Sequence, residues 1–186
     1  SPSFGLRFML YAGQLKRTLR KGWLESGVPG RVESVADHSF RMALAASQLI
    51  PQSLSVNRQR CVDMALIHDL AESIVGDITP NDQIDPAVKH KMETEAMGKL
   101  GDLLANPDDQ SRRQSFVTLF REYEEGVTLE ARVVRQLDIL DMLIQAYEYE
   151  CLHQSLCLDR FFESSLSKLN LDFAKGFATE LMDLRS

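Results

Sequence analysis

The chain has 186 residues, of which 44% are hydrophobic and 26% charged, and its net charge is -6 at neutral pH. This composition is typical of a globular domain with a sizeable core, and the negative charge without a basic run argues against a nucleic-acid partner. Every apolar run is far shorter than the roughly 20 residues that cross a bilayer, so we expect no membrane partner.

The three cysteines, Cys61, Cys151 and Cys157, form no CxxC pair and lie in apolar helical stretches. This pattern predicts small core residues in a reducing compartment and argues against a disulfide framework. We see no secretory signal, so we expect a cytoplasmic protein.

Hydrophobic spacing predicts a helix over residues 4–19, followed by a loop over 23–32 that contains glycine and proline. Ser34 stands where an N-cap is expected, and the helix behind it runs to about Ile50. The next predicted helix begins at Ser55 or Asn57 and runs to Val75. It is apolar nearly all round, which predicts burial, and Gly76 is placed to end it.

A polar loop over 77–83 precedes a helix that Asp85 caps and that extends from Pro86 to about Ala105. A surface turn over 106–110 and further helices over 111–125, 128–152, 159–169 and 171–184 complete the chain. No segment alternates with period two, and no linker or repeat divides the sequence. We therefore predict an all-α single domain over residues 1–186, with its core at about 15–150 and the C-terminal helices packed on it.

The predicted buried helix carries His68, Asp69 and Glu72 in its second half. In a continuous helix, spacings of three and four residues place these side chains on one broad face. An ionised carboxylate in apolar surroundings is costly unless it is paired or bound to a cation. This face therefore predicts a metal site.

Two residues from other helices are candidates for the missing ligands. His38 lies near the start of the helix capped by Ser34, and Asp138 follows the apolar Leu137 in the long helix over 128–152. Two histidines and two aspartates suit Mn, Fe, Co, Ni or Zn better than a thiol-loving ion. Four such ligands leave positions on an octahedral ion for water and substrate.

Taken singly, each of these residues also has an ordinary structural explanation. A helical histidine is usually a hydrogen-bonded core or surface residue, which is our interpretation of His90 and His153. We likewise interpret Asp141, Glu148 and Glu150 as solvated or structural acids. Only the joint pattern favours a metal site.

The order His38, His68–Asp69, Asp138 resembles the H…HD…D pattern of the HD-domain metal-dependent phosphohydrolases. The similarity is closer to the HD-domain 5'-deoxynucleotidases, particularly the eukaryotic type. The shared stretches are LKRT with GW (15–23), ESVADHSFRMA (33–43), HDLAE with GDI (68–78) and QLD with QAYEYE (136–150).

This resemblance implies a helical HD fold that hydrolyses deoxyribonucleoside 5'-monophosphates to deoxynucleoside and phosphate. The implied ligands of one divalent ion are His38, His68, Asp69 and Asp138. Glu72 matches the family's catalytic glutamate, which would orient or deprotonate a water, or assist departure of the 5' oxygen. Asp77 matches the sugar-reading aspartate, and we expect it to accept a hydrogen bond from the 3'-hydroxyl.

The eukaryotic type further implies a second divalent ion, such as Mg²⁺, bound by Glu72, Asp77 and the carbonyl of Ile78. This arrangement competes with the direct catalytic and sugar-binding roles of the two carboxylates. Binding of the ions could be followed by metal titration.

The substrate side departs from the bacterial relatives, which have arginine directly before the tryptophan where this chain has Gly22. We expect the phosphate to be reached by one of Arg17, Arg20 and Lys21. Trp23 is expected either to stack on a base or line the pocket, or simply to anchor its loop. Stacking would give little preference among bases.

Two other functions stay open at this point. The chain could be an HD phosphohydrolase acting on a cyclic or triphosphate nucleotide, although no additional catalytic insert favours this. It could also be a non-catalytic helical interaction module, against which the intact set of acids and histidines argues. The resemblance suggests a homodimer that acts on a small-molecule deoxynucleotide.

Overall fold

The structure is a computed structural model that describes residues 2–105 and 110–186. Within these residues the regular structure is helical, and a single isolated β-bridge joins Leu19 to Ser34. The prediction of an all-α fold is confirmed. Apart from Gln110, the surface turn predicted over 106–110 lies outside the described residues. No helix in the described part of the chain is both long and apolar enough to cross a bilayer.

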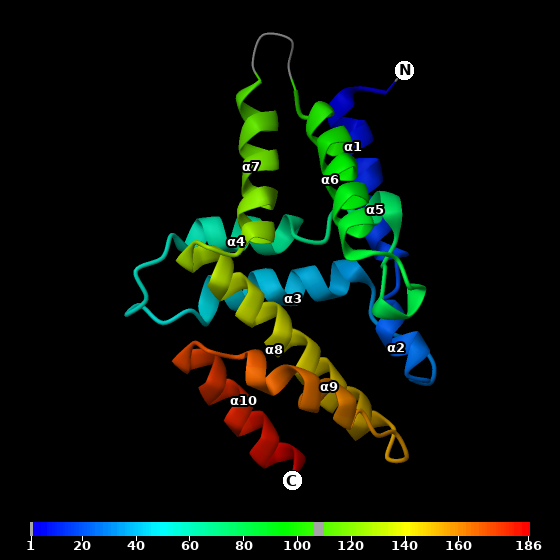
Figure 1. The fold of residues 1–186 in the computed structure, drawn as a ribbon, viewed down its shortest axis with the longest axis vertical. Helices are drawn as coiled ribbons and strands as arrows, with labels where there is room; N and C mark the ends of the chain where they lie inside the picture. Colours follow the sequence, from blue (N-terminus) through cyan, green and yellow to red (C-terminus); the bar gives the residue numbers. More distant parts are fainter. Residues whose placement is uncertain (1, 106–109) are drawn as a thin grey trace.

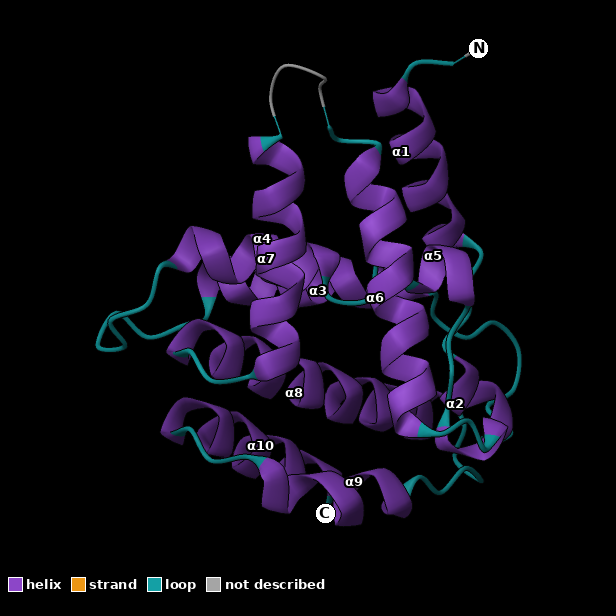
Figure 2. Ribbon diagram, turned by 45° about the horizontal axis from the view of Figure 1, so that its top comes forward, coloured by secondary structure: helices purple, strands orange, loops and turns teal. Residues whose placement is uncertain are grey.

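The helices are arranged in space in three layers (Figures 1 and 2). α1, α6 and α7 stand as an upper bundle, α3 and α4 cross beneath it, and α8 follows with α9 and α10 against its far side. The α-helices are α1 (Phe4–Ala12), α2 (Lys21–Glu25), α3 (Val35–Gln48), α4 (Arg58–Ile67), α5 (Glu72–Val75), α6 (Pro86–Asp102), α7 (Ser111–Glu125), α8 (Leu129–Leu152), α9 (Asp159–Ser165) and α10 (Asp172–Arg185). Short 3₁₀ turns are η1 (Gly13–Lys16), η2 (Pro80–Asp82) and η3 (Leu166–Lys168).

Two clusters of buried apolar side chains hold these layers together. The larger cluster joins α3, α4, α8 and α10, and Met64 and Ala65 near the end of α4 belong to it. The smaller cluster lies under α6 and α7 and includes Leu70 and Ala71. The chain thus passes from one cluster to the other at the His68–Asp69 dipeptide, which places these two residues at the boundary between the layers.

Side-chain caps fix where the predicted helices begin. The Ser34 hydroxyl accepts a hydrogen bond from the Asp37 N–H, and the Asp37 carboxylate accepts one from the Ser34 N–H. This reciprocal pair sets the start of α3 and places His38 in its second turn. Asp85 caps α6 as predicted, and Thr128, the first residue of the helix predicted over 128–152, caps α8.

The prediction of one continuous helix through residues 57–75 is wrong. α4 ends at Ile67, and the chain turns before α5 begins at Glu72. The Leu70 N–H donates to the Ile67 carbonyl at 3.0 Å and the Glu72 N–H donates to the Asp69 carbonyl at 3.0 Å. These bonds span three residues instead of four, so the backbone tightens and changes direction at the dipeptide.

Three smaller predictions also need correction. The helix expected over 4–19 ends at Ala12 and continues as the 3₁₀ turn η1. The loop expected over 23–32 begins inside α2. Among the cysteines only Cys61 is a core residue, because Cys151 and Cys157 are exposed; all three are free thiols.

Candidate metal centre

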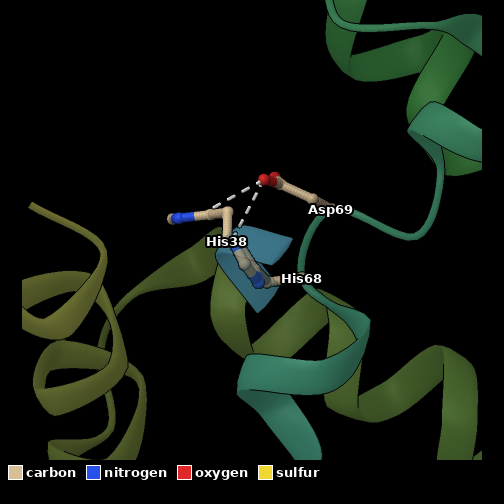
Figure 3. Close-up of side chains that lie close together, drawn as sticks. All are labelled: His38, His68 and Asp69. Atoms are coloured by element: carbon tan, nitrogen blue, oxygen red, sulfur yellow. Dashed lines mark ion pairs between the residues drawn. The ribbon is translucent and has the colours of Figure 1, made fainter. Parts of the chain in front are cut away.

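Three elements bring the four predicted ligands together. His38 comes from α3, His68 and Asp69 from the turn after α4, and Asp138 from α8. The His68 Nε2 atom lies 3.1 Å from Asp69 Oδ2. The His38 Nε2 atom lies 3.7 Å from the same oxygen and 3.2 Å from Asp138 Oδ1. Figure 3 shows Asp69 facing both imidazoles.

The two imidazoles are held by their outer nitrogens. The Nδ1 atom of His38 lies 2.6 Å from Asp141 Oδ2, and that of His68 lies 2.8 Å from the Ala65 carbonyl. Carboxylate and carbonyl oxygens only accept hydrogen bonds, so each Nδ1 atom carries a proton and donates it. The Nε2 atom of His38 therefore faces Asp69 and Asp138, and that of His68 faces Asp69, each from a fixed ring.

Both Nε2 atoms are buried and have no partner in hydrogen-bonding geometry within the described residues. Buried polar atoms without partners are uncommon and call for an explanation. A divalent cation between the imidazoles and the carboxylates supplies one, and the donor set of two nitrogens and two oxygens fits such an ion. The residues present therefore fit the metal that the sequence pattern predicts.

The site opens on its carboxylate side. The side chains of His38 and His68 are fully buried, while those of Asp69 and Asp138 are 20% and 32% exposed. The two aspartates thus border the open side of the site, while the imidazoles form its closed floor.

In the metal-free protein the cations and carboxylates of the cluster stabilise one another's charged forms. Burial and the charge of Arg20 oppose protonation of His38, but the carboxylates of Asp138 and Asp141 outweigh them and raise its pKa to about 9. Burial likewise opposes ionisation of Asp138, yet His38 lowers the pKa of that carboxyl to about 2. Despite burial, His68 and Arg20 hold the pKa of Asp69 well below its usual range. A bound cation would take the place of the proton on His38.

Glu72, the predicted catalytic residue, starts α5 and is only 6% exposed. Its Oε2 atom is buried without a hydrogen-bond partner in the described chain. Burial, followed by the negative charges of Asp69 and Asp77, raises the pKa of this carboxyl to about 10. Glu72 is therefore protonated at neutral pH in the metal-free protein. Its carboxyl interacts electrostatically with Asp69, one of the predicted ligands.

Asp77 lies just beyond a glycine turn that ends α5. Gly76 has φ 78° and ψ 172°, a conformation accessible essentially only to glycine. The Asp77 Oδ2 atom accepts a hydrogen bond of 2.6 Å from the Lys21 N–H in the first turn of α2. Ile78 follows in the same loop, so of the second predicted set of oxygen ligands it is Asp77 that is fixed against α2.

Of the three cations predicted to reach a phosphate, Arg20 lies closest to the metal centre. Its Nη1 atom donates to Asp69 Oδ2 at 3.3 Å, and its Nε atom lies 3.8 Å from Glu33 Oε1. The ammonium of Lys21 pairs instead with Asp82. Arg17 is exposed on the surface.

Trp23 is an anchor of its loop in this structure. It is 2% exposed, and its indole N–H donates to Glu33 Oε1 at 2.7 Å. Its ring packs against Phe161 and Tyr149, with centroids 4.6 Å and 5.3 Å away. This geometry does not support a base-stacking role and supports the alternative interpretation that we gave above.

Sequence reasoning missed two residues that contact the predicted ligands. Asp141 is 4% exposed and holds His38, so of the two interpretations given above, solvated or structural, the structural one applies. Its place three residues after Asp138, on the same helical face, was the available signal. The Tyr123 hydroxyl donates to Asp138 Oδ2 at 3.2 Å. Tyr123 comes from α7, and nothing in its own surroundings in the sequence pointed to the site.

Comparison with known proteins agrees with this geometry. A sequence model described as HD domain matches residues 12–181. The chain belongs to the HD domain family. The predicted membership of the HD superfamily is thereby confirmed.

The HD relatives cover nearly the whole chain. Proteins named 5'-deoxynucleotidase HDDC2 from Danio rerio and Homo sapiens are 42% and 44% identical, each over 97% of this chain and over 88% and 86% of the relative. A conserved hypothetical protein from Pyrococcus furiosus has a similar structure, with a TM-score of 0.77, 33% identity, and coverage of 97% of this chain and 98% of its own. HD domain-containing protein YGK1 gives a TM-score of 0.72 at 26% identity, over 99% and 86% of the two chains.

Proposed function

We propose that this HD-domain protein is a metal-dependent phosphohydrolase that cleaves deoxyribonucleoside 5'-monophosphates to deoxynucleoside and phosphate. The observation that carries the proposal is the pair of fully buried imidazoles whose unpartnered Nε2 atoms face Asp69 and Asp138. The names of its HD relatives support the choice of substrate.

The roles of the residues follow from their positions. His38, His68, Asp69 and Asp138 would hold the ion, which when bound polarises a phosphate oxygen and lowers the pKa of a coordinated water. We assign Arg20, which donates to Asp69, to another phosphate oxygen. We assign to Glu72, whose carboxyl is protonated in the metal-free protein, the transfer of its proton to the departing 5' oxygen or the orientation of the water.

Asp77 is our candidate for reading the sugar. The Lys21 N–H holds one of its oxygens, which limits the movement of the carboxylate. A carboxylate fixed in this way can accept a hydrogen bond from a 3'-hydroxyl and makes the pocket close-fitting at the neighbouring 2' carbon. This role supports a preference for deoxyribose.

A second divalent ion between Glu72, Asp77 and the Ile78 carbonyl stays part of the proposal. The unpartnered Oε2 atom of Glu72 supports it. Equilibrium titration with Mn²⁺ and Mg²⁺ would give two binding steps, and the weaker step would disappear in Glu72→Ala. A single step in the parent protein would contradict the second site.

The function is tested by measuring phosphate release from deoxy- and ribonucleoside mono-, di- and triphosphates and from cyclic nucleotides with Co²⁺, Mn²⁺ and Mg²⁺. We expect turnover of deoxyribonucleoside 5'-monophosphates and little turnover of the others. Preferential cleavage of a cyclic or triphosphate nucleotide would assign a different HD activity. No turnover of any compound by metal-loaded protein would favour a non-catalytic helical module.

Two variants separate metal binding from chemistry. Asp69→Ala is expected to lose both bound metal and activity. Glu72→Gln is expected to keep the first ion and to lose about 10²-fold to 10⁴-fold in kcat, because it removes the proton donor and base. Elemental analysis and phosphate-release kinetics on the same preparations measure both effects. Equal kcat for the Glu72 variant and the parent protein would refute the catalytic assignment.

Several finer features stay predictions. They are the physiological metal among the Mn, Co, Fe, Ni and Zn group, weak base preference, assembly as a homodimer, the folding of residues 1–186 as one domain, and a cytoplasmic location. Metal analysis, the same substrate panel, light scattering, limited proteolysis and cell fractionation would test them in that order.

A further inference from the structure

One face of α6 packs on the turn that carries the metal centre. Ala96, Met97 and Leu100 on this face are buried, and they share a cluster with Leu70 and Ala71. Leu70 and Ala71 directly follow Asp69 and directly precede Glu72 in the sequence. The inward face of α6 is thereby fixed against the segment that holds these two carboxylates.

Lys89 and Glu93 continue this inward face toward the N-terminus of α6. They precede Met97 by eight and four residues, which places all three side chains along one face of the helix. The Lys89 Nζ atom lies 3.5 Å from Glu93 Oε1, and the two side chains are 38% and 15% exposed. Lys89 is thus a half-buried cation at the edge of the packed face, with an ammonium that can still reach solvent.

The charge of Lys89 acts on the metal centre. Burial disfavours its charged form, but the carboxylates of Glu93, Glu72 and Asp69 outweigh burial and raise the pKa of the ammonium. Conversely, Lys89 is among the charges that lower the pKa of Glu72. Lys89 is therefore charged at neutral pH and lies in the same electrostatic field as the proposed catalytic carboxyl.

The metal centre needs further positive charge to accept a phosphate. The carboxylates of Asp69 and Asp138 repel a dianion, and Arg20 is already hydrogen-bonded to Asp69. A phosphate dianion offers three oxygens, and cations from more than one direction hold it best. Arg20 approaches Asp69 from the start of α2, whereas Lys89 belongs to α6, so these cations come from different elements.

We propose that Lys89 is a further phosphate-binding residue of this site and that Glu93 positions its ammonium. This inference rests on the proposed function, which supplies the phosphate. In the absence of substrate, Lys89 pairs with Glu93. When a phosphate monoester binds, the ammonium donates to a phosphate oxygen while Glu93 keeps the side chain directed along the inward face of α6.

The same helix offers a matched control. Lys91 and Glu95 form a pair with the same spacing, with Nζ and Oε1 4.0 Å apart, but their side chains are 77% and 58% exposed. These two residues lie on the outer face of α6. Comparing a Lys91 variant with a Lys89 variant therefore separates loss of a specific phosphate contact from the general effect of removing one positive charge.

The test compares Lys89→Met and Lys91→Met as full-length, metal-loaded proteins. Isothermal calorimetry with inorganic phosphate is expected to show an affinity about tenfold or more weaker for Lys89→Met and unchanged for Lys91→Met. With dAMP, KM should rise by a similar factor for Lys89→Met only. Lys89→Arg, which keeps the charge, should recover most of the affinity, and Glu93→Gln should weaken phosphate binding while the bound metal stays constant.

The outcomes distinguish this inference from the proposed function. If Lys89→Met binds phosphate as tightly as the parent protein, or if Lys89→Met and Lys91→Met lose affinity equally, Lys89 is not a phosphate ligand. If no deoxynucleotide is hydrolysed but phosphate affinity still falls only in Lys89→Met, the proposed function fails and the phosphate site stands. Should Lys89→Met not fold, failure of Glu93→Gln to change phosphate affinity refutes the positioning role.

Discussion

His38 is bracketed by two carboxylates from one helix. Asp138 lies beside its Nε2 atom at 3.2 Å and Asp141 beside its Nδ1 atom at 2.6 Å. Arg41 pairs with Asp141 and so offsets the negative charge buried behind the imidazole. Asp138 faces the predicted ion site and Asp141 fixes the imidazole ring, so two acids three residues apart on α8 have different roles.

Asp141→Asn should therefore weaken metal binding without removing a ligand. The amide can present its NH₂ group to Nδ1 and favour the wrong tautomer of His38, so we expect divalent-metal affinity to fall about 10-fold to 100-fold. Competition with a fluorescent chelator measures this change. Glu148→Gln is the control, because Glu148 contacts Arg41 on the exposed side. Its affinity should stay within about twofold of the parent value, and equal losses in both variants would contradict the positioning role.

At the residue scale the sequence predicted the four residues that the structure brings together, but not the residues that hold them in place. Histidines and aspartates in buried helices are uncommon enough that their chemistry is visible without coordinates. Asp141 looked like an ordinary helical acid because its burial depends on α3 packing against α8. The burial of Trp23 depends on Phe161, far away in the sequence, so its anchoring role could not be separated from base stacking.

The break between α4 and α5 is the element that shapes the centre. It lets the chain leave one apolar cluster after Ala65 and enter the other at Leu70. Gly76 then turns the chain again and delivers Asp77 to the first turn of α2. Two changes of direction within a short segment thus set the positions of the predicted ligands His68 and Asp69, of Glu72 and of Asp77.

Gly76→Ala should be destabilising because a Cβ atom is strained at φ 78° and ψ 172°. We expect the free energy of unfolding to fall by about 1–3 kcal/mol, together with a higher KM for dAMP as Asp77 shifts. Urea denaturation followed by circular dichroism measures the first effect. Gly98→Ala inside α6 is the control, because its added Cβ atom meets open space and should stabilise the helix by about 0.5–1 kcal/mol. A Gly76 variant as stable as the parent would argue against the strain.

Element boundaries were predictable where side chains cap the backbone, as at Ser34, Asp85 and Thr128. The break at His68 was not predictable, because a change from four-residue to three-residue hydrogen bonds leaves the apolar pattern almost unaltered. Tertiary packing of Leu70 and Ala71 under α6 decides that change.

At the scale of the whole molecule, the metal centre makes stability depend on pH. In the metal-free protein Glu72 and His38 have pKa values raised to about 10 and about 9, from ordinary values of 4.5 and 6.5. Between these limits the folded state holds protons that the unfolded chain releases, so the free energy of unfolding falls as pH rises. Asp138, with its pKa lowered to about 2, acts in the opposite direction and only in acid, where its contribution is lost as pH falls.

We therefore expect the Tm in EDTA to decrease from about pH 6 to about pH 8. Mn²⁺ should raise the Tm, and more so at the higher pH, because a cation competes with the proton on His38 and offsets the carboxylate charges. Differential scanning fluorimetry with and without Mn²⁺ measures both trends. A Tm in EDTA that increases over this range would show that other titrating groups dominate.

The four predicted ligands are spread from residue 38 to residue 138, over α3, the turn after α4, and α8. During synthesis on the ribosome, a nascent chain that has not yet extruded α8 lacks one ligand and the support of His38, so it cannot form the complete centre. On the proposed function, hydrolysis would begin only after α8 has docked onto α3. Fragments that stop short of that helix would then be unable to cleave nucleotides, however well their earlier helices had formed.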